Sequence, residues 1–270
     1  MGMIPLAELL PDEDFRLHLT LRRGRPEDFF RPLDPTGAVR RERARWLAED
    51  PDRYARVLPA GEALIREFAE QWPAAKAAWP EPAAEPKLRA DLWRLGTGCE
   101  ADLLFLAPDA AGDFRLAAGV LCFPTGWALE EKIGETIDFI HAPVPGLNAA
   151  LGSPIRSFLG KMRPGLAFLR DNWGIAATEE LNLHPARQLP APARPVGLDR
   201  LWLRVEHQML AALPSGAGIV FAIRIANYRL DDVVRGGGGP GLKRALATMP
   251  ADLAAYKRLE SVRAELLYLL

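Results

Sequence analysis

The sequence predicts an α+β protein in which an antiparallel sheet is flanked by helices and preceded by a helical or extended N-terminal segment. Strand-like segments gather in the middle of the chain and helix-like segments lie at both ends, without the regular strand–helix alternation of a parallel sheet. The chain has 270 residues, 49% of them hydrophobic. This predicts one main domain at 85–270, with an N-terminal extension at 1–84 that packs on it.

The N-terminal part is expected to combine extended chain with two helices. Several prolines among residues 1–35 favour an extended course over the surface. Helix-forming residues predict one helix at 36–49 and another at 61–79, which Pro73 ends or kinks. The second helix carries large apolar residues at a spacing of four, Leu64, Phe68 and Trp72. PEPAAEP at 80–86 predicts a stiff linker.

The middle of the chain is expected to form the sheet. Five segments have strand patterns, at 101–108, 113–124, 166–175, 198–210 and 216–230. In the fourth, aliphatic residues alternate with other types, which places Arg204 and Glu206 on one face. Four glycines at 236–239 predict a loop, and apolar residues at helical spacing predict a closing helix over 251–270.

Charge and composition exclude several classes of partner. The net charge of −1 gives no electrostatic reason to expect a nucleic-acid or anionic-membrane partner. No run of about 20 apolar residues predicts a membrane span, and the first residues lack the pattern of a signal peptide. Cys99 and Cys122 belong to no metal-binding pair and are expected to be reduced core thiols. We therefore expect a cytoplasmic protein.

Histidine is the residue type that points to chemistry. The chain has four histidines, none with a second one at helical spacing, and no GxSxG or HExxH motif. A single histidine still suffices as an axial ligand to haem, because the porphyrin supplies four nitrogens. His141 precedes the turn APVPG, whose prolines fix φ and restrict the setting of the imidazole. The alternative is that His141 only caps a short helix at 135–140.

Several blocks of sequence carry a resemblance to a known family. WALEEKIGETIDFIHAPVPG at 127–146 follows the pattern W-x-L-x-E-K-x-G-x-x-I-x-x-I-H-x-P-V-P. It resembles the haem-dependent oxidative N-demethylase family, in its α-subunit type. Further blocks occur in the same order, and the resemblance covers roughly 85–270: CFPTGW, RDNW, LRVEHQMLAALPSGAGIVFAIRIANYRL and YKRLESVRAELLYLL. It implies a PAS-like sheet that binds haem b and its iron.

The resemblance also implies an activity. It is the oxidative N-demethylation of a small secondary amine such as dimethylamine, with O₂ and external electrons, which releases formaldehyde. The sequence has no dinucleotide fingerprint and no cysteine set for an iron–sulfur cluster, so a separate reductase subunit or electron-transfer protein is expected. Two alternatives stay open, a haem-based gas or redox sensor without turnover, and a structural partner that has lost its cofactor.

The matching blocks imply roles for five residues. His141 would be the axial metal ligand. Lys132, Arg170 and Arg204 are candidates to pair with the haem propionates, although each could be an ordinary solvated charge. Glu206 would be the catalytic residue, which binds the alkylammonium group of the substrate or takes a proton from it. The alternative for Glu206 is an ion pair with Arg204 on the same face.

One position departs from the family pattern. Where that pattern has E-R-Q, this chain has His207 after Glu206. Histidine is shorter than arginine and only partly charged near neutral pH, so either the substrate or one contact is in doubt. His207 could also ligate haem or act as an acid–base group. His18 and His184 lie in proline-rich segments and are expected at the surface.

Overall fold

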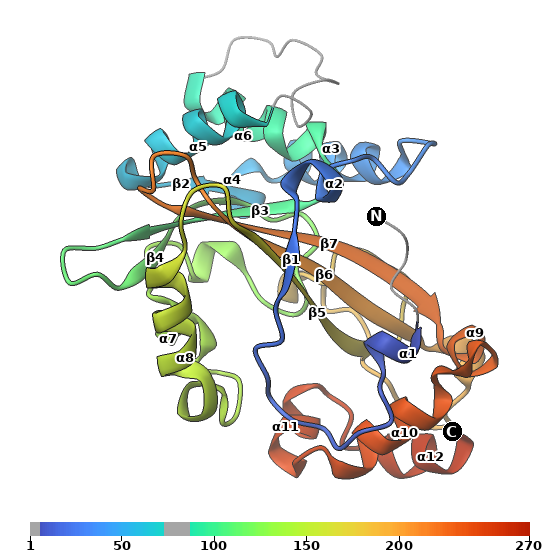
Figure 1. Ribbon diagram of the computed structural model, residues 1–270. Helices are drawn as coiled ribbons and strands as arrows, with labels where there is room; N and C mark the ends of the chain where they lie inside the picture. The colour runs from blue at the N-terminus through green and yellow to red at the C-terminus, as the bar shows by residue number, and fades with distance from the viewer. Residues whose placement is uncertain (1–5, 73–86) are drawn as a thin grey trace.

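The computed structural model describes residues 6–72 and 87–270 and shows a twisted sheet with helices at both of its ends and on its faces (Figure 1). The sheet has seven strands in the order β1-β5-β6-β7-β3-β4-β2, and all pairs are antiparallel. The strands are β1 (Arg22–Gly24), β2 (Ala55–Val57), β3 (Asp102–Pro108), β4 (Phe114–Val120), β5 (Ala167–Ala176), β6 (Trp202–Ala212) and β7 (Ile219–Arg229). The predicted α+β class with an antiparallel sheet is confirmed.

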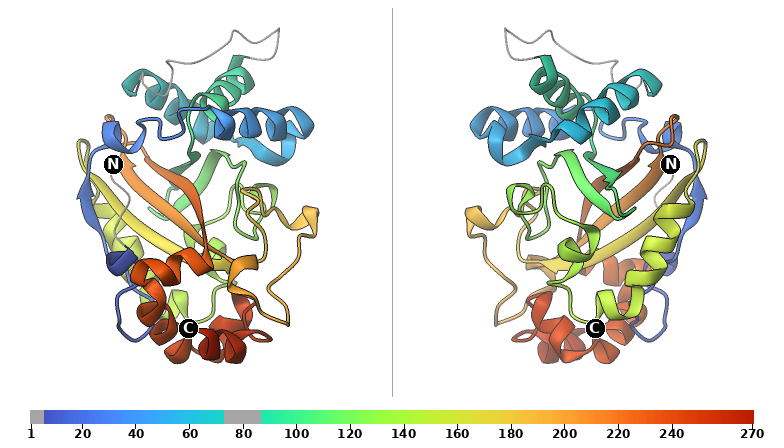
Figure 2. Two further views of the ribbon diagram at one scale, coloured as in Figure 1. Left: turned by 90° about the vertical axis from the view of Figure 1, so that its right-hand side faces the viewer. Right: turned by 90° about the vertical axis from the view of Figure 1, so that its left-hand side faces the viewer.

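The helices form three groups around the sheet (Figures 1 and 2). One end is covered by α2 (Pro26–Phe29), α3 (Ala38–Glu49), α4 (Pro51–Tyr54), α5 (Pro59–Gln71) and α6 (Lys87–Gly98). The other end is covered by α1 (Leu6–Leu9), α9 (Leu230–Val233), α10 (Gly239–Thr248), α11 (Ala251–Tyr256) and α12 (Arg263–Leu269). Between them, α7 (Ile137–His141) and α8 (Leu147–Lys161) lie against one face of the sheet, which we call the α7–α8 face.

The alternation of side chains along β6 defines the two faces. Leu203 and Val205 pack in a core with α10 and α12. Arg204 and Glu206 point to the opposite side, as the sequence predicted. In the register of the sheet Asn172 of β5 lies beside Glu206, and Ile225 of β7 lies on its other side. The α7–α8 face therefore carries a row of polar side chains next to apolar ones.

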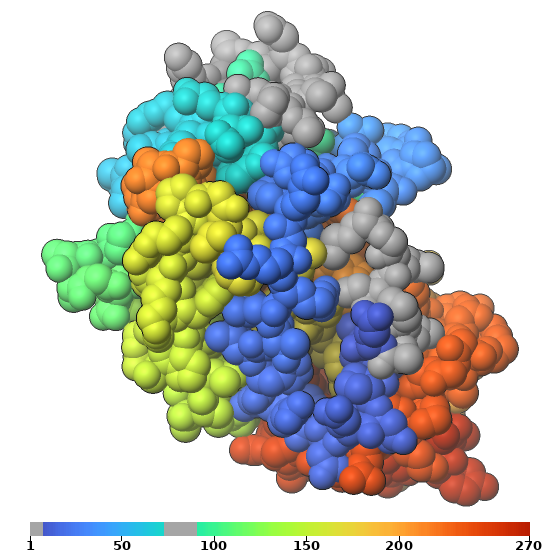
Figure 3. All heavy atoms as spheres, in the orientation of Figure 1, coloured from blue at the N-terminus to red at the C-terminus, as the bar shows by residue number. Residues whose placement is uncertain are grey.

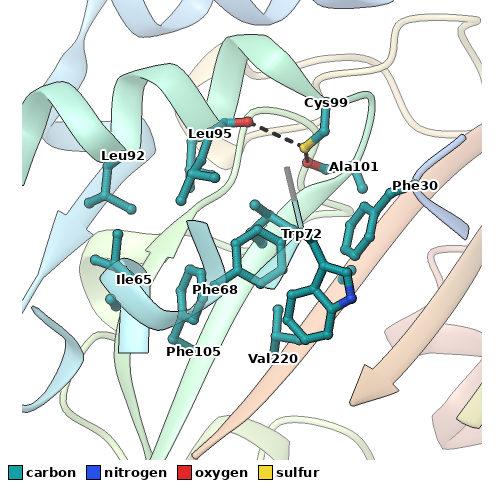
Figure 4. Packing of buried hydrophobic residues seen from close by; sticks show 14 of the residues in the cluster. Phe30, Ile65, Phe68, Trp72, Leu92, Leu95, Cys99, Ala101, Phe105 and Val220 are labelled. Atoms are coloured by element: carbon teal, nitrogen blue, oxygen red, sulfur yellow. Dashed lines mark hydrogen bonds between the residues drawn. The ribbon is translucent and has the colours of Figure 1, made fainter. Parts of the chain in front are cut away.

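The largest core joins α5 and α6 to the sheet (Figure 4). Leu64, Phe68 and Trp72 are all buried there, which confirms the predicted apolar face. Phe68 contacts Phe105 of β3 edge to face, with 5.4 Å between ring centroids. Both β1 and β2 come from the first 57 residues and pair with strands of the central part. The predicted linker at 80–86 lies outside the described residues.

Two predictions about the C-terminal part are wrong. The glycines at 236–239 do not form a separate loop but lie where two helical segments meet, between α9 and α10, at a kink in which Gly237 adopts the non-helical φ +87°. The segment 251–270 is two helices, α11 and α12, with a turn between them in which Arg258 has φ +58°. Apolar spacing detects the shared buried face of both helices and does not reveal the turn that separates them.

A buried ion pair ties α3 to the start of β3. Arg43 and Asp102 are both fully buried, with 2.6 Å between Nη1 and Oδ1, and Asp102 also accepts the backbone N–H groups of Cys122 and Phe123. Asp102→Ala leaves the arginine charge without its partner, which we expect to lower the free energy of unfolding by about 3–5 kcal/mol. Urea denaturation measures this, with Asp113→Ala in the exposed β3–β4 turn as control. A loss as small as the control's would contradict the account.

The two cysteines are free and buried, as predicted. Cys99 donates to the backbone oxygens of Leu95 and Ala101 (Figure 4). Burial raises the pKa of both thiols, and that of Cys122 to about 12. Since the thiolate is the reactive form, both residues should resist a disulfide reagent at pH 8 in the native protein. Both should react after unfolding in guanidinium chloride. Rapid labelling of either thiol before unfolding would show that the core is open.

Candidate functional site

His141 is the last residue of α7, on the α7–α8 face. The helix begins after Thr136, whose side-chain oxygen accepts the N–H of Phe139 at 3.2 Å. Ile137 and Ile140 pack toward the sheet. The proline turn follows directly, and in it the N–H of Val144 donates to the carbonyl of His141 at 2.9 Å. The short helix and the rigid turn fix the position of the imidazole from both sides.

The imidazole of His141 has no hydrogen-bond partner in the part of the chain that the structure describes. It is partly buried, and its Nδ1 is buried with no hydrogen-bond partner among the described residues. Burial lowers its pKa, and the nearby charge of Arg170 lowers it further. The ring is therefore neutral near pH 7 and has a lone pair that can bind a metal. An orphaned buried nitrogen of this kind is rare in a native structure and calls for an explanation.

Arg170 of β5 lies on the same face, beside Gln208 of β6. In the described part of the chain its guanidinium makes no hydrogen bond and no ion pair within 4 Å. Burial lowers its pKa, and the carboxylates of Glu206 and Asp171 oppose this effect. An arginine stays protonated under such conditions. Arg170 is partly buried, and no group among the described residues uses its donors.

Glu206 is held by two amides. Asn172 and Gln208 both donate to its Oε2, at 3.2 and 2.8 Å. Its Oε1 accepts no hydrogen bond from the residues that the structure describes, and the amide oxygen of Gln208 is buried without a partner. Glu206 and Arg204 form no ion pair within 4 Å in the described residues, because the guanidinium of Arg204 is bound elsewhere, although the charge of Glu206 still acts on it. The carboxylate is oriented, and one of its oxygens is open.

Arg204 organises the loops at the edge of this face. It is 1% exposed, and its Nε donates to Thr125 Oγ1 at 2.9 Å. The two terminal nitrogens donate to four backbone carbonyls, those of Phe123, Pro124, Glu180 and Leu181. Burial lowers its pKa to about 10. These bonds use nearly all of its donors, and its pairing with a propionate stays a prediction.

Lys132 follows the short helix at Leu129–Glu131 and packs on the outer side of α7. Its Nζ lies 5.2 Å from the ring centroid of Phe139, which is 51% exposed. The structure therefore brings His141, Arg170 and Glu206 to one face of the sheet. Arg204 instead binds the loop residues at 123–125 and 180–181. Lys132 lies beside the exposed ring of Phe139.

His207 and His184 lie away from this group. His207 is on the opposite face of β6, where its Nδ1 is 2.6 Å from Asp171 Oδ1, and Arg22 binds the same carboxylate. His207 is the position that departs from the family pattern, and it therefore lies on the other face of the sheet from Glu206. The expectation that His184 lies at the surface is wrong, since it is 4% exposed and its ring contacts Tyr54. His18 is exposed, as expected.

Sequence reasoning missed three residues of the site. Gln208 could have been found, because the period of two that places Glu206 on this face places Gln208 there too. Asn172 reaches Glu206 only through the register of β5 and β6. Lys257, just after α11, donates from Nζ to the carbonyl of Trp173 at 2.8 Å. Nothing in its local sequence distinguishes it from a surface lysine.

Together these groups define a class of protein. Among the described residues the imidazole has no partner and Arg170 has no anion. Together with a wall of apolar side chains, these groups fit a flat, anionic cofactor with one protein ligand. The wall includes Phe168, Phe221 and Ile225. Haem has these properties, because it takes an axial histidine and carries two propionates. The described residues contain no cluster of three or more histidine, cysteine or carboxylate ligands that could hold a bare metal ion.

The comparison with protein families leads to the same class. Residues 80–267 match the family described as haem-dependent oxidative N-demethylase, alpha subunit-like. The match covers well over half of the chain, and the protein belongs to this family. Its name indicates dependence on haem and an oxidative N-demethylase-like function. None of the helices in the described residues is long and apolar enough to span a membrane.

Proposed function

We propose that this chain binds haem b on the α7–α8 face, with His141 as the axial ligand, and oxidises an N-methyl group of a small secondary amine such as dimethylamine. The observation that supports this most strongly is the buried Nδ1 of His141, which has no partner in the described part of the chain. Two charged groups act on this ring, Arg170 more strongly than Asp138. The family provides the activity, and these residues provide a site that suits it.

The protein would hold the cofactor by three kinds of contact. His141 binds the metal, and the proline turn after it keeps the ring in place. Arg170 pairs with a propionate, for which a guanidinium has the right charge and geometry. The aromatic and aliphatic residues of the face exclude water from the ring system. Bound haem supplies the one-electron and O₂ chemistry that amino-acid side chains lack.

Glu206 would act on the amine. A dialkylamine is protonated near neutral pH, so its ammonium group can donate to the open Oε1 of Glu206. Asn172 and Gln208 keep the carboxylate aimed while it accepts the proton. The balance is one secondary amine, one O₂, two electrons and two protons to one primary amine, one formaldehyde and one water. The electrons come from a separate reductase subunit or electron-transfer protein, in the cytoplasm.

Turnover of the haem-loaded protein tests this function. Purified chain is reconstituted with haem and supplied with dimethylamine, O₂ and an electron-donor protein. We expect formaldehyde and methylamine in equal amounts, and neither product without haem. Protein that binds haem and O₂ but oxidises no methylated amine under any donor would refute the enzymatic function and favour a sensor.

A further inference from the structure

Lys257 lies at the end of α11 beside β5, and the core that anchors α11 also includes Val144 of the turn that follows His141. The N–H of Arg258 donates to Ala255 and the N–H of Leu259 to Ala254, both at 2.8 Å, with Arg258 in the left-handed region. This is the hydrogen-bond pattern of a Schellman motif, normally built with glycine. Leu253 and Ala254 anchor the helix in a small core with Trp173. The motif directs Lys257 to the edge of β5.

The contacts of Lys257 leave most of its donors unused. Its Nζ donates to the carbonyl of Trp173, which lies beyond the part of β5 that pairs with β1. Its ammonium lies 5.7 Å from the Trp173 ring centroid. An ammonium group has three N–H donors, and the described residues offer Lys257 no carboxylate within 4 Å. Burial lowers its pKa, and Glu206 is the carboxylate that opposes this effect.

The buried arginines of the described residues each have an anion or several acceptors, although one buried nitrogen of Arg43 and one of Arg224 have no hydrogen-bond partner. Arg43 binds Asp102 at 2.6 Å, Arg224 lies 3.8 Å from Glu100, and Arg204 binds five oxygen atoms. Lys257 and Arg170 are partly buried and, unlike these three, have neither an anion within 4 Å nor several acceptors among the described residues. The charge of Glu206 acts on both of them, as it does on Arg204. Cations withdrawn from water need an anion or several acceptors. The one open carboxylate oxygen of Glu206 cannot serve both of them and an amine.

We propose that Lys257 binds a carboxylate group that enters the α7–α8 face with a ligand. This inference rests on the proposed function, because it takes that face as the ligand site. A carboxylate can come from two sources there. One is a propionate of the cofactor, with Arg170 binding the other. The second is the substrate, in which case the amine is an N-methyl amino acid whose ammonium meets Glu206 and whose carboxylate meets Lys257.

Three variants isolate the charge. Lys257→Met keeps an unbranched chain against Trp173 and removes the ammonium, Lys257→Arg keeps a cation, and Lys243→Met on the exposed side of α10 is the matched control. Each is titrated with haem and with haem dimethyl ester, and the Soret band is followed. Each is then assayed with dimethylamine and with N-methylglycine. Circular dichroism confirms that the variants are folded.

The two sources give different results. If the carboxylate is a propionate, Lys257→Met weakens haem binding about tenfold, as loss of one charge-assisted hydrogen bond implies, and leaves ester binding unchanged. If it belongs to the substrate, haem binding is unchanged and kcat/KM falls about tenfold for N-methylglycine but not for dimethylamine. Lys257→Arg restores most of either loss. Equal effects on both porphyrins and both amines, or no effect on any, overturn the proposal.

Failure of the proposed function gives a separate signature. In that case the wild-type chain binds neither porphyrin and releases no formaldehyde. Calorimetric titration of the chain with N-methylglycine then decides the role of Lys257. Binding that Lys257→Met abolishes and Lys243→Met preserves supports a carboxylate site. Absence of binding to the wild-type chain overturns it.

Discussion

His141→Ala is expected to abolish tight haem binding. The variant removes the only side chain of α7 whose buried nitrogen lacks a partner in the described residues, and this side chain is the one that would hold the haem iron. Mutation of a residue that only contacts a metal ligand typically lowers metal affinity about 10–100-fold. We therefore expect loss of the ligand itself to lower haem affinity by more than this. A spectrophotometric titration with haem measures the effect. We expect no saturable Soret band, or a strongly shifted one.

His18→Ala is the control for this variant. His18 is the other histidine on which the charge of Arg170 acts, but it is exposed and hydrogen-bonded to Thr20. The control should bind haem with the affinity and spectrum of the wild-type protein. An unchanged spectrum in His141→Ala, or loss of the band in His18→Ala instead, would overturn the ligand assignment.

Glu206→Gln is expected to separate cofactor binding from catalysis. The amide keeps the shape of the side chain but can no longer take a proton or pair with an ammonium group. Proton transfer by a positioned residue contributes typically about 10²–10⁴-fold to rate, and kcat with dimethylamine should fall by an amount in this range. The Soret band should be unchanged. Formaldehyde release under saturating amine measures the loss.

The exposed Glu179 provides the matching control for Glu206. Glu179→Gln makes the same chemical change at the surface and should keep full activity. If Glu206→Gln turns over the amine at the wild-type rate, Glu206 is not the proton acceptor. If Glu206→Gln also loses haem, Glu206 has a structural role, and the assignment of catalysis to Glu206 and of haem binding to His141 is wrong.

The local sequence pattern was enough to place Arg204 and Glu206 on one strand face, but it did not predict their hydrogen-bond partners. A period of two correctly put Arg204 and Glu206 on one face of β6. Their partners come from elsewhere: Asn172 is 34 positions from Glu206, and the carbonyls that bind Arg204 lie 23 to 81 positions away. Only the antiparallel register and the path of the loops determine those contacts, and both depend on the whole fold.

The errors have a similar physical origin. His184 lies in a segment rich in proline and polar residues, which favours exposure. Asn182, two residues before it, is buried and donates a hydrogen bond to the hydroxyl of Tyr54, and His184 is buried with it. The glycines at 236–239 favour a loop by propensity, but tertiary packing overrides it. Gly241, just beyond them, lies so close to the backbone of Leu10 that no side chain would fit. Such packing is invisible in a local sequence window.

A crystal structure of the haem-loaded protein tests the central claim most directly. The account predicts haem against the α7–α8 face, its iron bonded to the imidazole of His141 and one propionate on Arg170. Haem on the opposite face near His207, or iron bound by any side chain other than His141, would contradict it.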